Sequence, residues 1–103
     1  MYNKLVRDDI PQIIADEGKI AITRRLANRE LIQALVAKLS EEGEEYLESM
    51  AAEEIADILE VVYGIISASG ESIENIESIR SKKKEERGGF SKGIFLESVE
   101  SNN

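Results

Sequence analysis

Acidic side chains are concentrated in two short stretches, and these are the clearest candidates for chemistry. One stretch is residues 41–45 (EEGEE) and the other is residues 54–57 (EIAD). Each contains a pair of acids at positions i and i+3, Glu42 with Glu45 and Glu54 with Asp57. On a helix that spacing places both side chains on one side, about one turn apart. Carboxylates gathered so closely repel each other, and a divalent cation removes that conflict.

The residue types that are absent narrow the chemistry further. The 103 residues contain no His, no Cys and no Trp. This excludes a disulfide framework, a thiolate nucleophile, a zinc–thiolate site and a catalytic triad that uses imidazole. Hard oxygen donors favour Mg²⁺ or Mn²⁺, and Mg²⁺ is commonly shared with substrate phosphates. The carboxylates therefore indicate both a metal and a phosphorylated ligand.

The overall composition predicts one small acidic domain over residues 1–103. There are 21 acidic and 13 basic residues, giving a net charge of −8, and 42% of the residues are apolar, which is enough for a core. A chain this acidic is a poor candidate for generic nucleic-acid binding, which needs a basic surface. The segment of residues 1–9 carries charged side chains, and no apolar run in the sequence approaches the roughly 20 residues of a membrane span. We therefore expect neither nucleic acid nor membrane as a partner, and a cytoplasmic location.

The elements that must position these acids are mostly helical. Apolar side chains repeat every three or four residues in four segments, so we expect a mostly α fold with about four helices. The expected helices run from Ile10 to a stop at Gly18, from Arg29 to about Ser49 after an Asn28 N-cap, from about Ala52 to Ser69, and from Ser72 to the Gly88-Gly89 break. Gly43 interrupts the second helix, where we expect it to let a neighbour approach closely.

Two shorter segments predict a small β addition. In residues 19–26 apolar and polar side chains alternate in part, and the apolar run 94–96 could pair with them as a second strand.

In the third helix, between Ile55 and Ile66, Asp57 and Glu60 are the charged residues. A helix this apolar is expected to pack on more than one side, which favours a homodimer or homotetramer.

Helical geometry places the acids at the edge of the apolar stripes. Glu42 lies about 60° from Leu39, and Glu54 about 80° from Val62, at 100° per residue. If the second and third helices form an antiparallel hairpin, both pairs flank the same seam. A solvated acidic helix face would give the same pattern, so the residues alone leave a metal site and a solvating surface as alternatives.

The acidic stretches, taken with their flanks, resemble a known enzyme group. Glu41-Glu42-x-x-Glu45 followed by Glu54-x-x-Asp57 resembles the metal-binding signature of the MazG-like all-α nucleotide pyrophosphohydrolases. The opening YNKLVRD of residues 2–8, and residues 83–96 with KxxxRGGF and IFL, are similar to a subgroup of phosphoribosyl-ATP-pyrophosphohydrolase-like proteins. The resemblance covers nearly the whole chain and implies an all-α nucleoside triphosphate pyrophosphatase-type helical bundle.

The resemblance also implies an activity and residue roles. The activity is Mg²⁺-dependent hydrolysis of a nucleoside triphosphate between the α- and β-phosphates, with Mn²⁺ as an alternative metal. The implied role is to clear surplus or damaged nucleotides. Glu41 would orient or deprotonate water. The metal ligands would be Glu42, Glu45, Glu54 and Asp57. The cations that hold the substrate would be Lys4, Arg7, Lys38, Lys83 and Arg87.

Several alternatives stay open at this level. Lys38 is also spaced for an i,i+4 salt bridge with Glu42, and the basic run 82–84 also fits a solvated helix end. A rival activity is phosphoribosyl-ATP pyrophosphohydrolysis in histidine biosynthesis. A rival of another class is a non-catalytic helical interaction module whose acids only solvate the surface.

Overall fold

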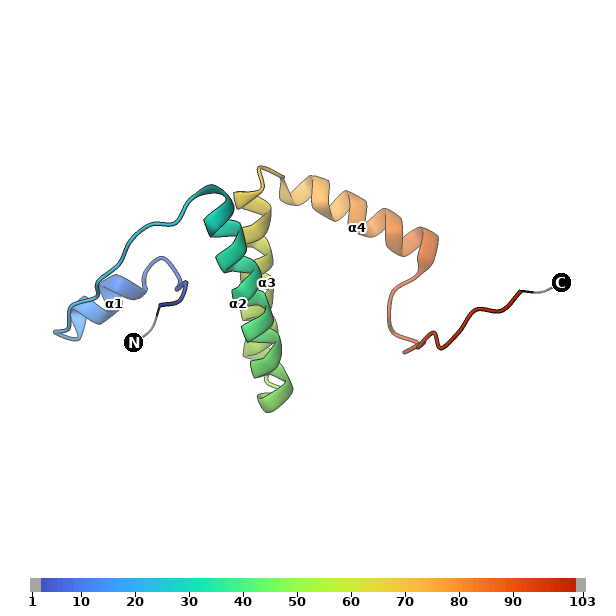
Figure 1. Cartoon of the computed structure of the whole chain (residues 1–103), viewed down its shortest axis with the longest axis horizontal. Coiled ribbons are helices and arrows are strands. Elements are labelled where there is room, and N and C mark those ends of the chain that lie inside the picture. Colours follow the sequence, from blue (N-terminus) through green and yellow to red (C-terminus); the bar gives the residue numbers. More distant parts are fainter. Residues whose placement is uncertain (1–2, 102–103) are drawn as a thin grey trace. The chain divides into compact units, whose positions relative to one another are not determined.

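The structure, a computed structural model, describes residues 3–101 and is mostly α. Within these residues it has four helices (Figure 1). They are α1 (Ile10–Asp16), α2 (Asn28–Ser49), α3 (Ala52–Ala68) and α4 (Ile73–Arg87). The mostly α class and the four helices confirm the sequence prediction. The chain divides into two compact units, Met1–Ile73 and Glu74–Asn103, which are described separately below. The expectation of one domain stays a prediction.

The hairpin of α2 and α3 is the packed part of the first unit. Met50 has a left-handed backbone (φ 54°), and its N–H donates to the Tyr46 carbonyl at 2.7 Å. This turn reverses the chain within two residues, so α3 runs back along α2 (Figure 1). Leu35 of α2 and Val61 and Ile66 of α3 are the buried apolar side chains of the described chain. α2 and α3 therefore pack against each other along one seam, and only part of each apolar stripe lies in it.

A glycine sets how closely the two helices approach, but it is not the one expected. A Cβ added at Gly64 would lie 3.0 Å from Leu35 Cδ2, so Gly64 makes room for that leucine. A Cβ added at Gly43 would meet nothing within 4 Å. The expectation that Gly43 admits a neighbour is therefore wrong within this chain, because the side of α2 that carries Gly43 is open.

The helix ends agree with the predicted stops and differ at one predicted start. Gly18 and Gly70 follow the last residues of α1 and α3 with φ of 79° and 80°, the left-handed geometry that glycine adopts without strain. Asn28, expected as the N-cap of α2, is instead its first residue, and Ala27 is the N-cap without a side-chain hydrogen bond. Asn28 has φ 53°, so its backbone is turned away from the extended geometry of a capping residue.

The predicted two-stranded β addition is wrong. Among residues 3–101 the structure has no strand, and both segments expected to pair, residues 19–26 and 94–96, are irregular. Ile20 and Ile22 are 92% and 97% exposed, so no partner surface covers them. An isolated pair of strands is at best marginally stable in water, and alternation over so few residues does not supply a hydrophobic face.

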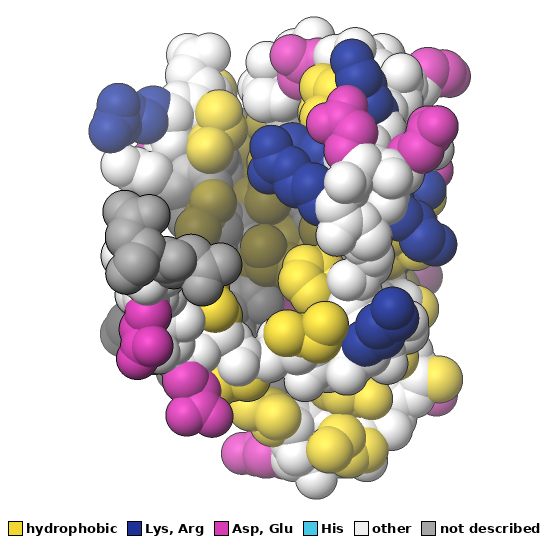
Figure 2. Space-filling model, turned by 90° about the vertical axis from the view of Figure 1, so that its right-hand side faces the viewer, with side chains coloured by type: hydrophobic (Ala, Val, Ile, Leu, Met, Phe, Trp, Pro, Cys, Tyr) yellow, Lys and Arg dark blue, Asp and Glu magenta, His cyan; other side chains and the backbone are white. Residues whose placement is uncertain are grey.

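Many large apolar side chains of α2 and α3 remain at the surface. They are Val36, Leu47, Ile55, Leu59 and Tyr63. Hydrophobic side chains are visible at the surface among charged ones in Figure 2. At 100° per residue, Val36 lies about 120° from Glu42 around α2, and Leu59 about 140° from Glu54 around α3. The exposed apolar residues Val36, Leu47, Ile55 and Leu59, here called the apolar face, therefore lie on a different side of the hairpin from the acids.

None of the helices found in residues 3–101 is both long and apolar enough to cross a membrane.

Candidate metal centre

Acidic residues from both helices of the hairpin converge near its turn. Glu42 lies on α2, and Glu54 and Asp57 lie in the first two turns of α3. Each offers a carboxylate oxygen, and these three oxygens lie within 4.8 Å of one another. The turn at residues 50–51 brings this about, because it places the end of α2 beside the start of α3. We call these three residues the acidic cluster.

Glu42 is the most unusual member of the acidic cluster. It is 6% exposed and is the buried charged residue of the described chain. Its Oε1 lies 3.4 Å from Lys38 Nζ, while its buried Oε2 has no hydrogen-bond partner, and neither has the buried Oε2 of Glu54. A buried carboxylate oxygen without a partner is costly. The crowding of acids is one indication of a cation site, and these two unpartnered buried oxygens are an independent second one.

Burial and crowding change the acidity of one member of the cluster, Glu54, and of its neighbour Glu45. Burial, followed by the proximity of Glu42, Glu45 and Asp57, raises the pKa of Glu54 to about 7. The pKa of Glu45 is also raised, first by its closeness to Glu42. Glu45 is exposed and lies beside the cluster without sharing its three-oxygen arrangement. In the absence of a metal, Glu54 is therefore partly protonated near neutral pH.

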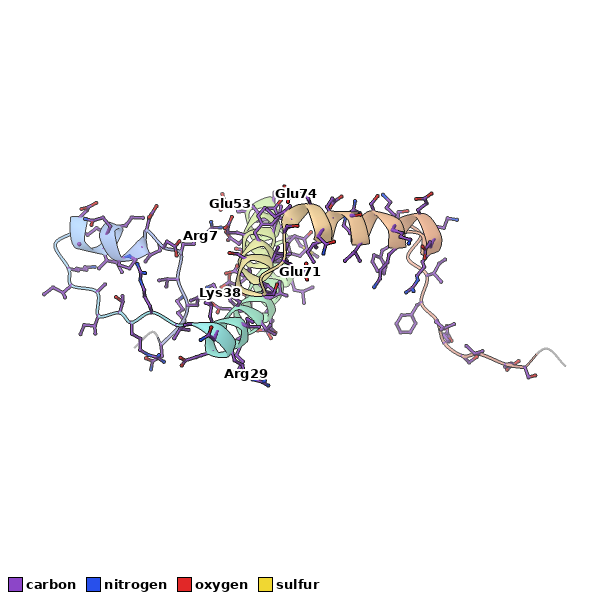
Figure 3. The ribbon with its side chains drawn as sticks, turned by 90° about the horizontal axis from the view of Figure 1, so that it is seen from above. Arg7, Arg29, Lys38, Glu53, Glu71 and Glu74 are labelled. Carbon is purple, nitrogen blue, oxygen red and sulfur yellow. The ribbon has the colours of Figure 1, made fainter. Side chains whose placement is uncertain are left out.

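Two cations partly neutralise the acids. The Arg7 guanidinium donates from Nη2 to Asp57 Oδ1 at 2.7 Å. Lys38 Nζ lies 3.4 Å from Glu42 Oε1 and 3.6 Å from Glu41 Oε1. Figure 3 shows Arg7 and Lys38 on the same side of the α2–α3 pair. The i,i+4 salt bridge between Lys38 and Glu42 is therefore present in the structure. A substrate-binding role for Lys38 stays a prediction.

A small cavity of about 220 Å³ includes in its lining Lys38, the cation that pairs with Glu42. The cavity lies between residues 3–5 and α2, and Lys38 and Glu41 both line it. Its lining is Asn3, Lys4, Leu5, Ala34, Ala37, Lys38 and Glu41. The predicted catalytic residue Glu41 and two of the predicted substrate cations, Lys4 and Lys38, therefore share one cavity.

The remaining predicted cations belong to the second unit. Lys83 and Arg87 lie on α4 and are exposed. Their part in a common site with the acidic cluster stays a prediction.

Sequence reasoning missed two kinds of contact. It did not identify Asn3 and Leu5 as cavity-lining residues, although both flank the candidate Lys4 in the opening motif. It also did not foresee that Arg7 binds Asp57 directly, because residues 50 positions apart give no periodic signal. The sequence did contain one signal for this contact, because the basic residues of the opening motif have a charge opposite to that of the acidic hairpin.

The acidic cluster fits a hard divalent cation. Its donors are carboxylate oxygens from two helices, and two oxygens are buried without partners in the structure described. Mg²⁺ and Mn²⁺ prefer such donors, and Mg²⁺ keeps several waters, so three protein ligands leave room for a phosphate. Glu42, Glu54 and Asp57 would hold the ion, with Glu45 next to them.

Comparison with known proteins does not assign a family. No protein-family model matches this chain, and neither a curated protein nor a solved structure matches it.

Proposed function

We propose that the chain is a Mg²⁺-dependent nucleoside triphosphate pyrophosphohydrolase. The reaction adds water across the bond between the α- and β-phosphates and yields a nucleoside monophosphate and pyrophosphate. Chemically it requires charge neutralisation of the phosphates, an oriented water and a place for the base. A bound divalent cation would supply the neutralisation and would activate water.

The observation that carries this proposal is the state of Glu42. Lys38 reaches Oε1 of this buried carboxylate, but Oε2 has no partner and two further acids offer oxygens within 4.8 Å, which is costly unless a second cation binds there. A solvating acidic face would instead keep each carboxylate in water. The acids on the far side of α2, such as Glu44, do stay exposed.

The other residues divide the remaining tasks. Glu41 and Lys38 line the same cavity, where Glu41 would accept a proton from water and Lys38 would offer a cation to phosphate. Lys4 lines the same cavity, and Arg7 reaches the cluster through Asp57. We include Lys83 and Arg87 as further phosphate-binding candidates on the strength of the sequence resemblance.

The test is a panel of nucleoside triphosphates, including phosphoribosyl-ATP, with detection of released pyrophosphate. We expect Mg²⁺-dependent release from at least one triphosphate. Glu42→Gln and Asp57→Asn should each abolish it without loss of helix content. Glu44→Gln is the matched control, because it removes the same charge from the exposed side of α2.

The outcomes separate the alternatives. Turnover confined to phosphoribosyl-ATP would assign the chain to histidine biosynthesis instead. If no member of the panel is cleaved, and Glu42→Gln leaves Mg²⁺ binding unchanged, the enzymatic proposal fails. An interaction module would then be the better description.

We also infer that the apolar face is covered by a second copy of this chain in a homodimer or homotetramer. The three buried apolar residues of the described chain form a small core, whereas the apolar face is exposed. Two copies of an amphipathic hairpin bury such faces against each other in a four-helix bundle. That arrangement leaves the acids, on a different side of each hairpin, accessible to a nucleotide.

A further inference from the structure

Arg7 ties the N-terminal segment, residues 3–9, to the acidic cluster. Its guanidinium binds Asp57 Oδ1 at 2.7 Å, and residues 3–5 of the same segment form one wall of the cavity beside Lys38 and Glu41. The segment has no helix or strand of its own. One ion pair therefore links the wall of the cavity to an acid that could hold a metal.

We propose that Arg7 substitutes for the divalent cation in the metal-free protein. Arg7 and the metal then compete for Asp57. This inference rests on the metal centre of the proposed function and adds an order of events. Metal binding weakens the Arg7–Asp57 pair, releases the N-terminal segment from α3, and frees the guanidinium for a phosphate of the substrate.

The geometry makes such competition feasible. The two side chains are 58% and 39% exposed, so water screens the pair and the guanidinium can leave without stranding a buried charge. By contrast, Lys38 is 20% exposed and faces the buried Glu42, so it is expected to stay. Of the two cations at the cluster, Arg7 is the one that can be exchanged.

The opposite role makes the opposite prediction. If Arg7 instead oriented Asp57 for the metal, its removal would weaken metal binding, as loss of an orienting partner usually does. If Arg7 competes, its removal must strengthen metal binding by the factor by which the metal weakens the ion pair, because the coupling is reciprocal. The sign of the change in affinity therefore decides between the two roles.

The experiment is calorimetric titration of Mn²⁺ into the wild-type chain, Arg7→Gln and Arg24→Gln. Arg24 pairs with the exposed Glu30, so Arg24→Gln is a control that loses the same charge away from the cluster. We expect Arg7→Gln to bind Mn²⁺ about two- to fivefold more tightly than both others, the range of an exposed ion pair. Equal or weaker binding by Arg7→Gln overturns the inference.

A second readout follows the N-terminal segment itself. In the wild type, Mg²⁺ should raise the backbone mobility of residues 3–9, measured by NMR relaxation, and Arg7→Gln should show that higher mobility before metal is added. Unchanged or lower mobility with Mg²⁺ overturns the inference. If the wild type and both variants bind no Mn²⁺, the metal centre of the proposed function fails too. Normal Mn²⁺ binding with no difference between the variants rejects the role of Arg7 alone.

Discussion

Lys38 Nζ lies 3.4 Å from Oε1 of Glu42, and the two side chains are 20% and 7% exposed. The pair connects one turn of α2 to the next and places a cation beside the buried member of the acidic cluster. It also reaches Glu41 at 3.6 Å. Lys38 therefore stabilises the buried carboxylate when no metal is bound.

Replacing Lys38 by Met should destabilise the metal-free protein. The substitution keeps much of the aliphatic stem but leaves Glu42 buried with both oxygens unpaired, which costs about 1–3 kcal/mol. Chemical denaturation measures the change in the free energy of unfolding. Arg24→Met is the control, because its pair with Glu30 is solvent-exposed and contributes little to stability. Equal effects of the two substitutions would contradict the role given to Lys38.

The raised pKa of Glu54 predicts that the metal-free protein loses stability as pH rises. The folded-state pKa is about 7, above the ordinary value of 4.5, so the folded state binds this proton more tightly than the unfolded state. The resulting stabilisation is fully present below pH 4.5 and is lost as the pH rises through about 7. The melting temperature, measured with a chelator present, should fall across this window.

Two variants isolate the contribution of Glu54 to this pH dependence. Glu54→Gln removes the titrating group and should flatten the melting-temperature profile between pH 4.5 and about 7. Glu44→Gln removes an exposed acid and should leave the profile as in the wild type, apart from a small general charge effect. A profile that is equally steep in Glu54→Gln would show that other acids cause it.

Magnesium should reverse the loss of stability at high pH. At pH 8 Glu54, with its pKa of about 7, is mostly ionised, so a cation that binds only the folded state adds stability that grows with its concentration. At 100 times the dissociation constant the gain is about 2.7 kcal/mol. Melting at pH 8 with increasing Mg²⁺ measures it, and Glu42→Gln should show little gain. An identical Mg²⁺ response in Glu42→Gln would argue against a specific site.

Sequence reasoning was most successful where structure is local. Helical periodicity and glycine stops predicted all four helices to within about two residues, because both signals reside in neighbouring residues. The convergence of Glu42 with Glu54 and Asp57 was predicted from spacing plus one short turn. The strands failed because pairing depends on distant segments. Arg7–Asp57 and Gly64–Leu35 were missed for the same reason, since no periodic pattern links residues so far apart.

Gly64 should resist replacement because of Leu35. An added Cβ would lie 3.0 Å from the leucine Cδ2 in the seam, and overpacking of this kind costs about 1–3 kcal/mol. Removing a glycine from a helix returns about 1 kcal/mol, so Gly64→Ala should change stability by a net loss of roughly 0–2 kcal/mol. Denaturation of Gly64→Ala, Leu35→Ala and the double variant tests the contact. The double variant should lose less than the sum of the single losses, and strict additivity would show that the two positions do not interact.

Charge placed on the apolar face should prevent the association of two copies inferred above. Leu59→Asp puts a carboxylate among the exposed apolar side chains of α3, and burying it against a second copy would cost several kcal/mol. Sedimentation should then show a monomer with unchanged helix content, whereas Ile20→Asp, in an irregular and exposed segment, should sediment like the wild type. Because Leu59 lies about 140° from Glu54 around α3, the Leu59→Asp monomer should still bind Mn²⁺. A wild type that is already monomeric at micromolar concentration would leave the apolar face without the partner inferred for it.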